Sequence, residues 1–243
     1  MRTIDICLSP TLLPLHDLTG KTVVVVDILR ATSTMCTAIA HGVERIIPVS
    51  TLEECRVLQS LGYLTAAERD GKKAEGFDFG NSPFSFMDEG LNGRTIAMTT
   101  TNGTLAIAKS RAAREVLIGS FLNLEALCDY LIQQPNNILI FCAGWKGKAN
   151  VEDTLFAGAI VDELSDYLEY ESDAPLMAAT LYNSAKNDLR GFLEQSSHVR
   201  RLQKLEIHKD IDFCLQHSIY SVIPVLQDNA LVKMQLVYVR KAL

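Results

Sequence analysis

An apolar, β-branched run at residues 22–26 ends directly on Asp27, and Arg30 follows three residues later. Such a run is typical of a buried strand, because branched side chains pack well on a pleated surface. In open α/β sheets, ligands bind outside the carboxyl ends of the strands. The sequence therefore predicts that Asp27 lies where a protein of this class binds its ligand.

Strand patterns and helix patterns alternate along the first two thirds of the chain. The predicted strands are 3–8, 22–27, 45–49, 64–68, 94–99, 115–118 and 137–142. The predicted helices are 32–41, 51–61, 101–110, 122–133 and 153–168. This alternation implies βαβ units and a sheet with helices on both faces. The expected fold class is α/β, a three-layer α/β/α arrangement with a mostly parallel or mixed sheet.

The last third of the chain has a different pattern. Residues 174–194 and 197–215 are expected to be mostly helical, and 222–225 and 231–239 to form two closing strands. Pro224 lies inside the first of these strands, which predicts that the strand is short or at an edge of the sheet. The 243 residues are expected to form one domain, 1–243, with room for a two-lobed arrangement whose later lobe starts at about residue 170.

Composition excludes several classes of protein. A net charge of −6 argues against nucleic-acid binding, because no basic stripe is available to neutralise phosphates. The longest apolar runs are far shorter than the roughly 20 residues that span a bilayer, and no signal segment is recognised at the start of the sequence. The six cysteines show no CxxC pairing, which favours reduced, buried thiols in a cytoplasmic protein over zinc ligands or disulfides.

Asp27 is the first candidate for chemistry. A carboxylate at a strand end can bind a divalent cation or attack phosphorus. Thr32, Ser33 and Thr34 begin the next helix, where free N–H groups favour an anion, and Arg30 can add a bidentate phosphate contact. The alternative is a buried aspartate that caps the helix, with the hydroxyls as further caps.

A second polar turn, 99–104, follows the apolar strand around residue 97 and repeats this arrangement. Hydroxyl groups, a glycine that permits close backbone approach and a helix start together favour a phosphate or carboxylate. A threonine-rich helix cap with an Asn-Gly turn is the alternative. The candidate substrate-binding residues here are Thr100, Thr101, Asn102, Gly103 and Thr104.

Glu68 and Arg69 follow another short strand, so Glu68 is a candidate metal ligand and Arg69 a candidate anion contact; a solvated charge run is the alternative. The irregular segment 69–93 comes next, and a loop this long is usually functional or disordered. Its four phenylalanines favour an ordered, packed loop. Asn81 and Ser82 in this loop are candidate substrate-binding residues, although turn formation explains the same residue types.

The loop after the strand at 137–142 contains Lys146 and leads to Glu152 and Asp153. Mg²⁺ prefers oxygen ligands, often one or two carboxylates with water and substrate phosphate, so Glu152 or Asp153 could join Asp27 in holding it. An acidic pair in a first helical turn that stabilises the helix dipole is the alternative. Cys142 is expected to be a buried thiol, because the residue six positions later is Lys148 and not the arginine of a cysteine-dependent phosphatase.

Several strings occur in the same order in a known family: 25–34, 67–69, 75–83, 99–104, 119–121 and 142–144. In these strings the chain resembles the 2-phosphosulfolactate phosphatase family (ComB-like proteins) over nearly its whole length. The resemblance implies a magnesium-dependent phosphatase that hydrolyses (2R)-phosphosulfolactate to sulfolactate, a step on a route to coenzyme M. It also implies the family's α/β/α fold and a homodimer.

The chain departs from the family pattern at two places. Ala67 stands where the family typically has glycine, and Gln216, His217 and Ser218 stand where an aspartate is expected before the Val-Pro strand. The second departure leaves the C-terminal segment without the carboxylate that the resemblance implies.

The combined expectation is a cytoplasmic, Mg²⁺-dependent phosphomonoesterase that acts on a small, doubly acidic substrate. Asp27, Arg30 and Glu68 would be catalytic, and Arg69 or Lys146 would pair with the second anion of the substrate. The expected metal ligands are Asp27, Glu68, Glu152 and Asp153. The alternative is a non-catalytic binding or sensor protein for a phosphorylated or carboxylated metabolite, which would use the same anion sites without a metal.

Overall fold

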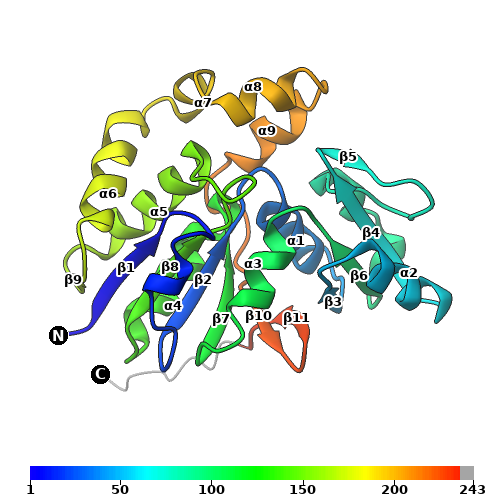
Figure 1. The fold of residues 1–243 in the computed structure, drawn as a ribbon, viewed down its shortest axis with the longest axis horizontal. Helices are drawn as coiled ribbons and strands as arrows, with labels where there is room; N and C mark the ends of the chain where they lie inside the picture. Colours follow the sequence, from blue (N-terminus) through cyan, green and yellow to red (C-terminus); the bar gives the residue numbers. More distant parts are fainter. Residues whose placement is uncertain (236–243) are drawn as a thin grey trace.

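The structure is a computed structural model that describes residues 1–235. Its centre is an 11-stranded mixed sheet in the order β5-β4-β6-β3-β11-β10-β7-β2-β8-β1-β9 (Figure 1). The strands are β1 (Thr3–Cys7), β2 (Thr22–Val26), β3 (Arg45–Pro48), β4 (Leu64–Arg69), β5 (Lys72–Lys73), β6 (Thr95–Thr99), β7 (Glu115–Gly119), β8 (Ile138–Cys142), β9 (Glu169–Tyr170), β10 (Pro224–Gln227) and β11 (Ala230–Lys233).

Helices lie on both faces of this sheet. The α-helices are α1 (Ala31–Ala40), α2 (Leu52–Ser60), α3 (Gly103–Lys109), α4 (Leu124–Gln133), α5 (Val151–Leu164), α6 (Ala174–Ala185), α7 (Leu189–Leu193), α8 (Ser197–Gln203) and α9 (His208–Cys214). Short 3-10 helices are η1 (Leu13–Leu15), η2 (Pro83–Phe86), η3 (Glu89–Leu91) and η4 (Phe121–Asn123). The expected three-layer α/β fold with a mixed sheet is confirmed.

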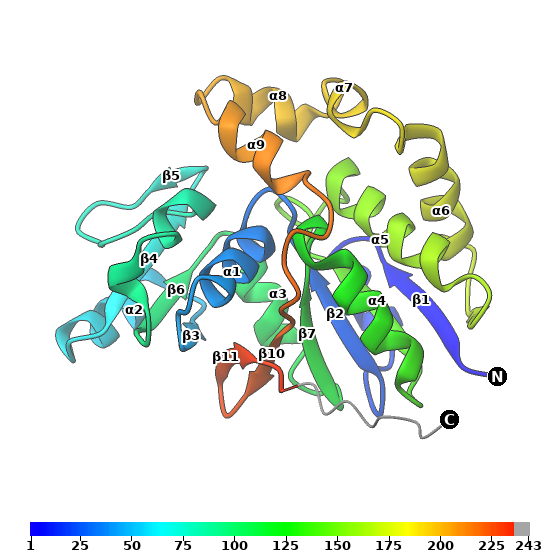
Figure 2. The ribbon, with the colours of Figure 1, turned by 180° about the vertical axis from the view of Figure 1, so that it is seen from behind.

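Strand β2 shows how the sequence produces the layers. All five of its residues are buried, and successive side chains point to opposite faces of the sheet. Val24 and Val26 pack in one core with Leu127 of α4 and Ile160 of α5. Val23 and Val25 join the other core, which also includes residues of α1 and α3. The two views in Figures 1 and 2 show these helices on the two sides of the central strands.

All seven strands expected before residue 170 are present, each within one residue of the predicted ends. The ranges 174–194 and 197–215 are mostly helical, as expected, and each contains two helices. Residues 174–194 contain α6 and α7, because the Asp188 carboxylate accepts a bond from the N–H of Gly191 at 2.9 Å and begins a new helix. Residues 197–215 contain α8 and α9, separated near Glu206, whose backbone φ is 61°. The two-residue strands β5 and β9 were not predicted.

The two predicted closing strands are present as β10 and β11. Strand β10 is short, as Pro224 predicted, but it lies inside the sheet between β7 and β11. Proline is tolerated there because it is the first residue of the strand. The second expected strand, 231–239, is observed as β11; its residues 236–239 lie outside the described part of the chain.

The hairpin β10–β11 joins two groups of strands. Within each group the long strands pair in parallel, β1, β2, β7 and β8 on one side and β3, β4 and β6 on the other. The hairpin pairs antiparallel with both groups, through Val225 opposite Leu117 and through Leu231 opposite Ile46. The sheet is therefore continuous, but the hairpin pairs with each group of strands through one residue pair in register.

The segment 69–93 is ordered and packed, as its phenylalanines predicted. Phe77 and Phe86 are buried, and the rings of Phe79 and Phe86 are 5.4 Å apart. Phe84 packs against Phe213 of α9 at 5.1 Å. Across the described range 1–235, the structure contains no helix with both the length and the apolar character needed to cross a membrane.

Candidate active site

A small polar cavity lies where the loops after β2, β4, β6 and β8 meet α8. Figure 1 shows α8 and α9 above the upper ends of the central strands. Its volume is about 20 Å³, which is room for about one water or ion. It is lined by Asp27, Leu29, Arg30, Glu68, Asp70, Gly71, Asn81, Thr101, Asn102, Trp145, His198, Arg201 and Leu202. We call the residues after β2, β4 and β6 the floor (Asp27, Arg30, Glu68, Thr101, Asn102) and those from the β8 loop and α8 the cover (Trp145, His198, Arg201, Leu202).

The loop after β2 holds Asp27 in place through local hydrogen bonds. The N–H of Asp27 donates to Thr32 Oγ1 at 3.0 Å, and the N–H of Ala31 donates to the Asp27 carboxylate at 3.4 Å. The Ser33 hydroxyl donates to the Ile28 carbonyl at 2.9 Å. Thr32, Ser33 and Thr34, the residues predicted to offer N–H groups to an anion, are buried and do not line the cavity, and their hydroxyls bond to backbone groups.

Glu68 is the next-to-last residue of β4, and its carboxylate ties two loops together. One carboxylate oxygen accepts from the N–H of Gly71, and the other accepts from the N–H and hydroxyl of Thr101 at 3.3 and 3.2 Å. The β4 and β6 loops therefore meet at Glu68. Arg69, the next residue, points elsewhere: it donates to the Glu68 carbonyl and to Thr99 Oγ1 and does not line the cavity.

The 99–104 turn is built for close packing. Thr100 and Thr104 exchange hydrogen bonds, each hydroxyl accepting from the other's backbone N–H at 3.2 and 3.1 Å. A Cβ at Gly103 would lie 2.5 Å from Ala31 Cβ and 3.0 Å from the Asp27 carboxylate. Only glycine lets α3 approach the Asp27 loop this closely. The predicted meeting of Asp27 with this turn is therefore present.

Asn81 brings the 69–93 loop to the cavity. Its backbone carbonyl accepts from the Thr34 hydroxyl at 3.1 Å, and the residue is 6% exposed. Its side-chain Oδ1 is buried and has no hydrogen-bond partner within residues 1–235. A buried acceptor without a donor is costly unless a ligand completes it. Ser82 lies in a shallow neighbouring hollow with Asn81 and Arg30.

Glu152 and Asp153 lie behind the cavity at the start of α5. Both are fully buried and neither lines the cavity. The Asp153 carboxylate accepts from the N–H groups of Ile28 and Gly144 at 2.9 and 3.0 Å. It therefore fixes the β2 loop to the β8 loop. Burial raises the pKa of Asp153 well above its usual range, and the carboxylates of Asp27 and Glu152 raise it further.

Glu152 holds a residue that spacing in the sequence did not select. One carboxylate oxygen bonds to Nδ1 of His198, and the other accepts from the Ser196 hydroxyl at 3.4 Å. His198 is 6% exposed and its ring stacks on Trp145, with 6.0 Å between centroids and 20° between planes. The carboxylate fixes the ring while the other edge of the imidazole remains directed at lining residues.

Arg30 is neutralised by a residue that sequence reasoning also missed. Its Nη1 forms an ion pair with Asp210 of α9, and its Nη2 donates to the Gly71 carbonyl at 3.0 Å. Asp210 lies in the C-terminal third, where the family resemblance implied a carboxylate at a later position. No spacing in the sequence could have paired residues 180 positions apart.

Lys146 lies at the rim of the cavity. Its ammonium group is 3.2 Å from the Asp70 carboxylate, and its side chain is 56% exposed. Its backbone N–H donates to Asn102 Oδ1 at 3.3 Å, which connects the β8 loop to the β6 loop. Asp70 and Lys146 both have positive φ angles, 53° and 49°.

The carboxylates make the cavity electrostatically unusual. Burial raises the pKa of Asp27 to about 6; nearby His198 lowers it, whereas Glu68 and Glu152 raise it. Two carboxylates that face one buried cavity disfavour each other's charged form, and a cation between them would remove that penalty. Within residues 1–235, no cluster of three or more His, Cys, Asp or Glu side chains could hold a metal ion.

Cys142 is fully buried, and burial raises the pKa of its thiol, as expected for a packing residue.

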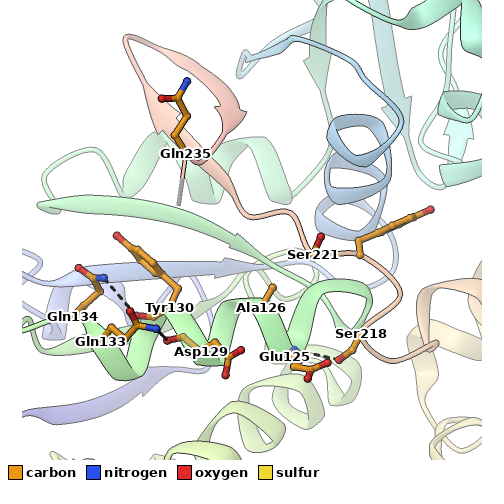
Figure 3. A pocket seen from close by; sticks show the side chains of 10 residues that line it. Glu125, Ala126, Asp129, Tyr130, Gln133, Gln134, Ser218, Ser221 and Gln235 are labelled. Carbon is orange, nitrogen blue, oxygen red and sulfur yellow. Dashed lines mark hydrogen bonds between the residues drawn. The ribbon is translucent and has the colours of Figure 1, made fainter. Parts of the chain in front are cut away.

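A larger hollow of about 580 Å³ lies over α4, away from these loops (Figure 3). Glu125 and Asp129 are its charged lining residues, and no lysine or arginine of the described chain lines it. It borders Gln235, the last described residue. Its negative charge makes it unsuitable for a phosphoester.

Comparison with known proteins identifies the family. The profile of the family described as "2-phosphosulpholactate phosphatase" matches residues 7–229. The chain is 40% identical over 219 residues to a probable 2-phosphosulfolactate phosphatase of Caldanaerobacter subterraneus subsp. tengcongensis, covering 88% of this chain and 91% of the relative. It is 39% identical over 212 residues to the protein of that description from Thermotoga petrophila, covering 87% and 92%. For the one from Clostridium acetobutylicum the identity is 36% over 226 residues, covering 91% and 96%. The chain belongs to the 2-phosphosulfolactate phosphatase family.

Proposed function

We propose that the protein is a Mg²⁺-dependent phosphatase that hydrolyses a small acidic phosphomonoester, with (2R)-2-phospho-3-sulfolactate as the substrate and 3-sulfolactate and phosphate as the products. Family membership supports the reaction. The observation that carries the proposal is that one cavity is lined by Asp27, Glu68, Arg30 and Asn81, whose Oδ1 is a buried acceptor without a partner among the described residues. The carboxylates and the amide oxygen can bind a cation, and the guanidinium can bind a phosphate.

The lining residues fit Mg²⁺. Asp27 and Glu68 supply carboxylate oxygens, and the unpartnered Asn81 Oδ1 supplies a neutral oxygen. Mg²⁺ commonly takes one or two carboxylates and completes its shell with water and substrate phosphate. Glu152 and Asp153, the other predicted ligands, are fully buried and do not line the cavity, so we assign the metal to Asp27, Glu68 and Asn81. When bound, the ion would draw charge from the phosphoryl oxygens.

The chain's own residues do the remaining work. Arg30, fixed by Asp210 and the Gly71 carbonyl, stabilises the charge that develops on the phosphoryl group. Asp27 is placed to attack phosphorus or to orient the attacking water. His198, whose Nδ1 is held by Glu152, can deliver a proton from Nε2 to the leaving oxygen. A carboxylate that holds the far nitrogen keeps the imidazole oriented for this transfer.

Substrate must enter through a change in the cover. A phosphoester does not fit in about 20 Å³, so the α8 segment or the β8 loop has to move before it binds. Two of the contacts that close the site are an exposed ion pair between Lys146 and Asp70 and the stacking of His198 on Trp145. The bond from Arg201 to the Asp70 carbonyl and the buried bond between His198 and Glu152 also hold the cover. Movement of this kind is common where a site must exclude water during the reaction.

Three further expectations belong to this proposal: a homodimer, a cytoplasmic location and a place on a route to coenzyme M. Light scattering on protein eluting from a size-exclusion column tests for the homodimer. Fractionation of the source cells tests for the cytoplasmic location. The third depends on the substrate that the enzyme prefers.

A direct assay tests the proposed function. Phosphorylated 2-hydroxy acids are incubated with the protein in Mg²⁺ and in EDTA, and released phosphate is measured. Mg²⁺-dependent release supports the proposal, and absence of release in both conditions contradicts it. The alternative, a metal-free metabolite sensor, predicts that a phosphate analogue raises the melting temperature equally with and without Mg²⁺. The paired carboxylates of the floor would repel an anionic metabolite, which favours the enzyme.

A further inference from the structure

The cavity contains one guanidinium group that no carboxylate of the described residues neutralises. Arg201 of α8 lines the cavity, and no ion pair found in residues 1–235 includes it. Its Nη1 donates to the Asp70 carbonyl at 3.0 Å, and its Nη2 lies 3.0 Å from His198 Nε2. Its Nε is buried and has no partner in the same range. The guanidinium carbon lies 4.9 Å from the centre of the Trp145 ring, which supports the group from one face.

The other cations near the site already have partners. Arg30 is paired with Asp210. Lys146 is paired with Asp70 at the surface. Arg69 donates to a carbonyl and a hydroxyl outside the cavity lining. Arg201 is partly buried, and its Nε–H is withdrawn from water without an acceptor among the described residues. A buried donor without a partner is costly, so this N–H and the unpaired charge beside it are best explained by an anion that binds there.

The position of Arg201 indicates which part of a substrate this anion belongs to. Asp27, Glu68, Asn81 and Arg30 provide the groups for a cation and a phosphate. Arg201 belongs to the cover, together with Trp145 and His198. A phosphate bound on the floor would therefore direct the rest of the molecule toward Arg201.

We infer that Arg201 binds the second acidic group of the substrate, a carboxylate or sulfonate near the ester-bearing carbon, and that this contact determines specificity. The inference rests on the proposed function and names the residue of the same site that selects for the acidic group. Trp145 holds the guanidinium flat, so that its N–H groups are presented in the fork that matches a carboxylate or sulfonate. When the acid binds, Arg201 Nη2 donates to it in place of His198 Nε2. His198 Nε2 is then available to protonate the leaving oxygen.

A matched pair of substrates tests this. In 2-phospholactate the ester carbon bears a carboxylate, and in isopropyl phosphate a methyl group takes its place. Wild-type protein should prefer 2-phospholactate in kcat/KM. Arg201→Ala should reduce kcat/KM for 2-phospholactate roughly 10- to 100-fold, the usual value of hydrogen bonds to a charged group, and change it little for isopropyl phosphate. The kcat/KM of Arg201→Lys for 2-phospholactate should lie between the values for wild type and Arg201→Ala.

The adjacent residue provides a matched control. Arg200 lies on the same helix but is exposed, and its Nε donates to the Glu194 carbonyl at 3.0 Å. Arg200→Ala should leave the ratio between the two substrates unchanged. Circular dichroism and the melting temperature check that both variants fold.

Two results would overturn the inference. One is an equal loss of kcat/KM for both substrates in Arg201→Ala, which would assign Arg201 to the phosphate or to the fold. The other is a wild-type protein that does not distinguish the two substrates. If wild-type protein hydrolyses neither phosphoester in Mg²⁺, the proposed function is wrong. In that case, calorimetric binding of the same two compounds in EDTA still decides the role of Arg201, because an unchanged affinity ratio in Arg201→Ala contradicts it.

Discussion

The floor and the cover of the cavity are built differently. Floor residues follow strands of the central sheet, and backbone N–H groups fix several of their side chains, as at Asp27 and Glu68. Cover residues come from one loop and a seven-residue helix, and they contact each other mainly through side chains, as His198 does with Trp145 and Arg201. A rigid floor suits positioning of the reacting phosphate, and a less constrained cover suits admission and selection of substrate.

The largest effect is expected from the floor. Asp27→Asn should reduce turnover by at least about a thousandfold, because it removes the charge that holds the metal or attacks phosphorus. Released phosphate measures this loss. Turnover near the wild-type level would remove Asp27 from the mechanism.

The same variant should show a pH-dependent gain in stability in EDTA. Burial raises the pKa of Asp27 to about 6, above its unfolded value of about 3.9. The folded state therefore holds this proton more tightly, and wild-type stability contributed by Asp27 is lost as pH rises from about 4 through 6. The amide of the Asp27→Asn variant does not titrate, so the melting temperature of the variant should rise relative to wild type over that range. A constant difference would contradict the raised pKa.

The next effect is expected from the cover. His198→Gln should reduce kcat about 100-fold for an alkyl phosphoester, as is typical for loss of a general acid. The loss should be much smaller for p-nitrophenyl phosphate, whose leaving group needs no proton. Equal losses for both esters would mean that His198 only supports the fold of the cover.

A steric change in the floor should act on stability as well as on activity. Gly103→Ala places a Cβ 2.5 Å from Ala31 Cβ, and such overpacking costs about 1–3 kcal/mol. The free energy of unfolding in urea measures it. Gly90→Ala is the control, since its nearest contact would be the Asp88 side chain at 3.1 Å. Equal effects of the two substitutions would show that the β2 loop tolerates separation from α3.

The smallest effect is expected at the rim of the cover. Lys146→Ala removes an exposed ion pair with Asp70, which is worth about 0–1 kcal/mol. Its kcat/KM should stay within about threefold of wild type. A loss as large as that of Arg201→Ala would place the second anion at Lys146, as the sequence suggested.

The sequence predicted the floor better than the cover for a physical reason. Alternating burial and strand-end carboxylates are local signals, so the placement of Asp27, Glu68 and the 99–104 turn followed from the strands alone. His198, Asp210 and Arg201 reach the cavity only because α8 and α9 dock on the loops of distant strands. Pairings such as Glu152 with His198 depend on tertiary contact, and no spacing along the chain encodes them.

The hydroxyl groups teach a related lesson. Thr32, Ser33 and Thr34 look like anion ligands in sequence, yet their hydroxyls bond to the backbone of the Asp27 loop and the 69–93 loop. The same residue types serve both uses, and only burial distinguishes them. The N–H groups of Thr32 and Thr34, which the sequence predicts to be free for an anion, donate to the Asp27 and Arg30 carbonyls at 2.9 Å.

The hairpin of β10 and β11 has a consequence for synthesis of the protein. This hairpin pairs with both sets of parallel strands and joins them into one sheet, yet it lies near the end of the sequence. A ribosome that has synthesised every residue assigned to the site, from Asp27 to Asp210, has not yet added this hairpin. The nascent protein must therefore keep two unfinished sheet edges apart from other chains until its final strands emerge.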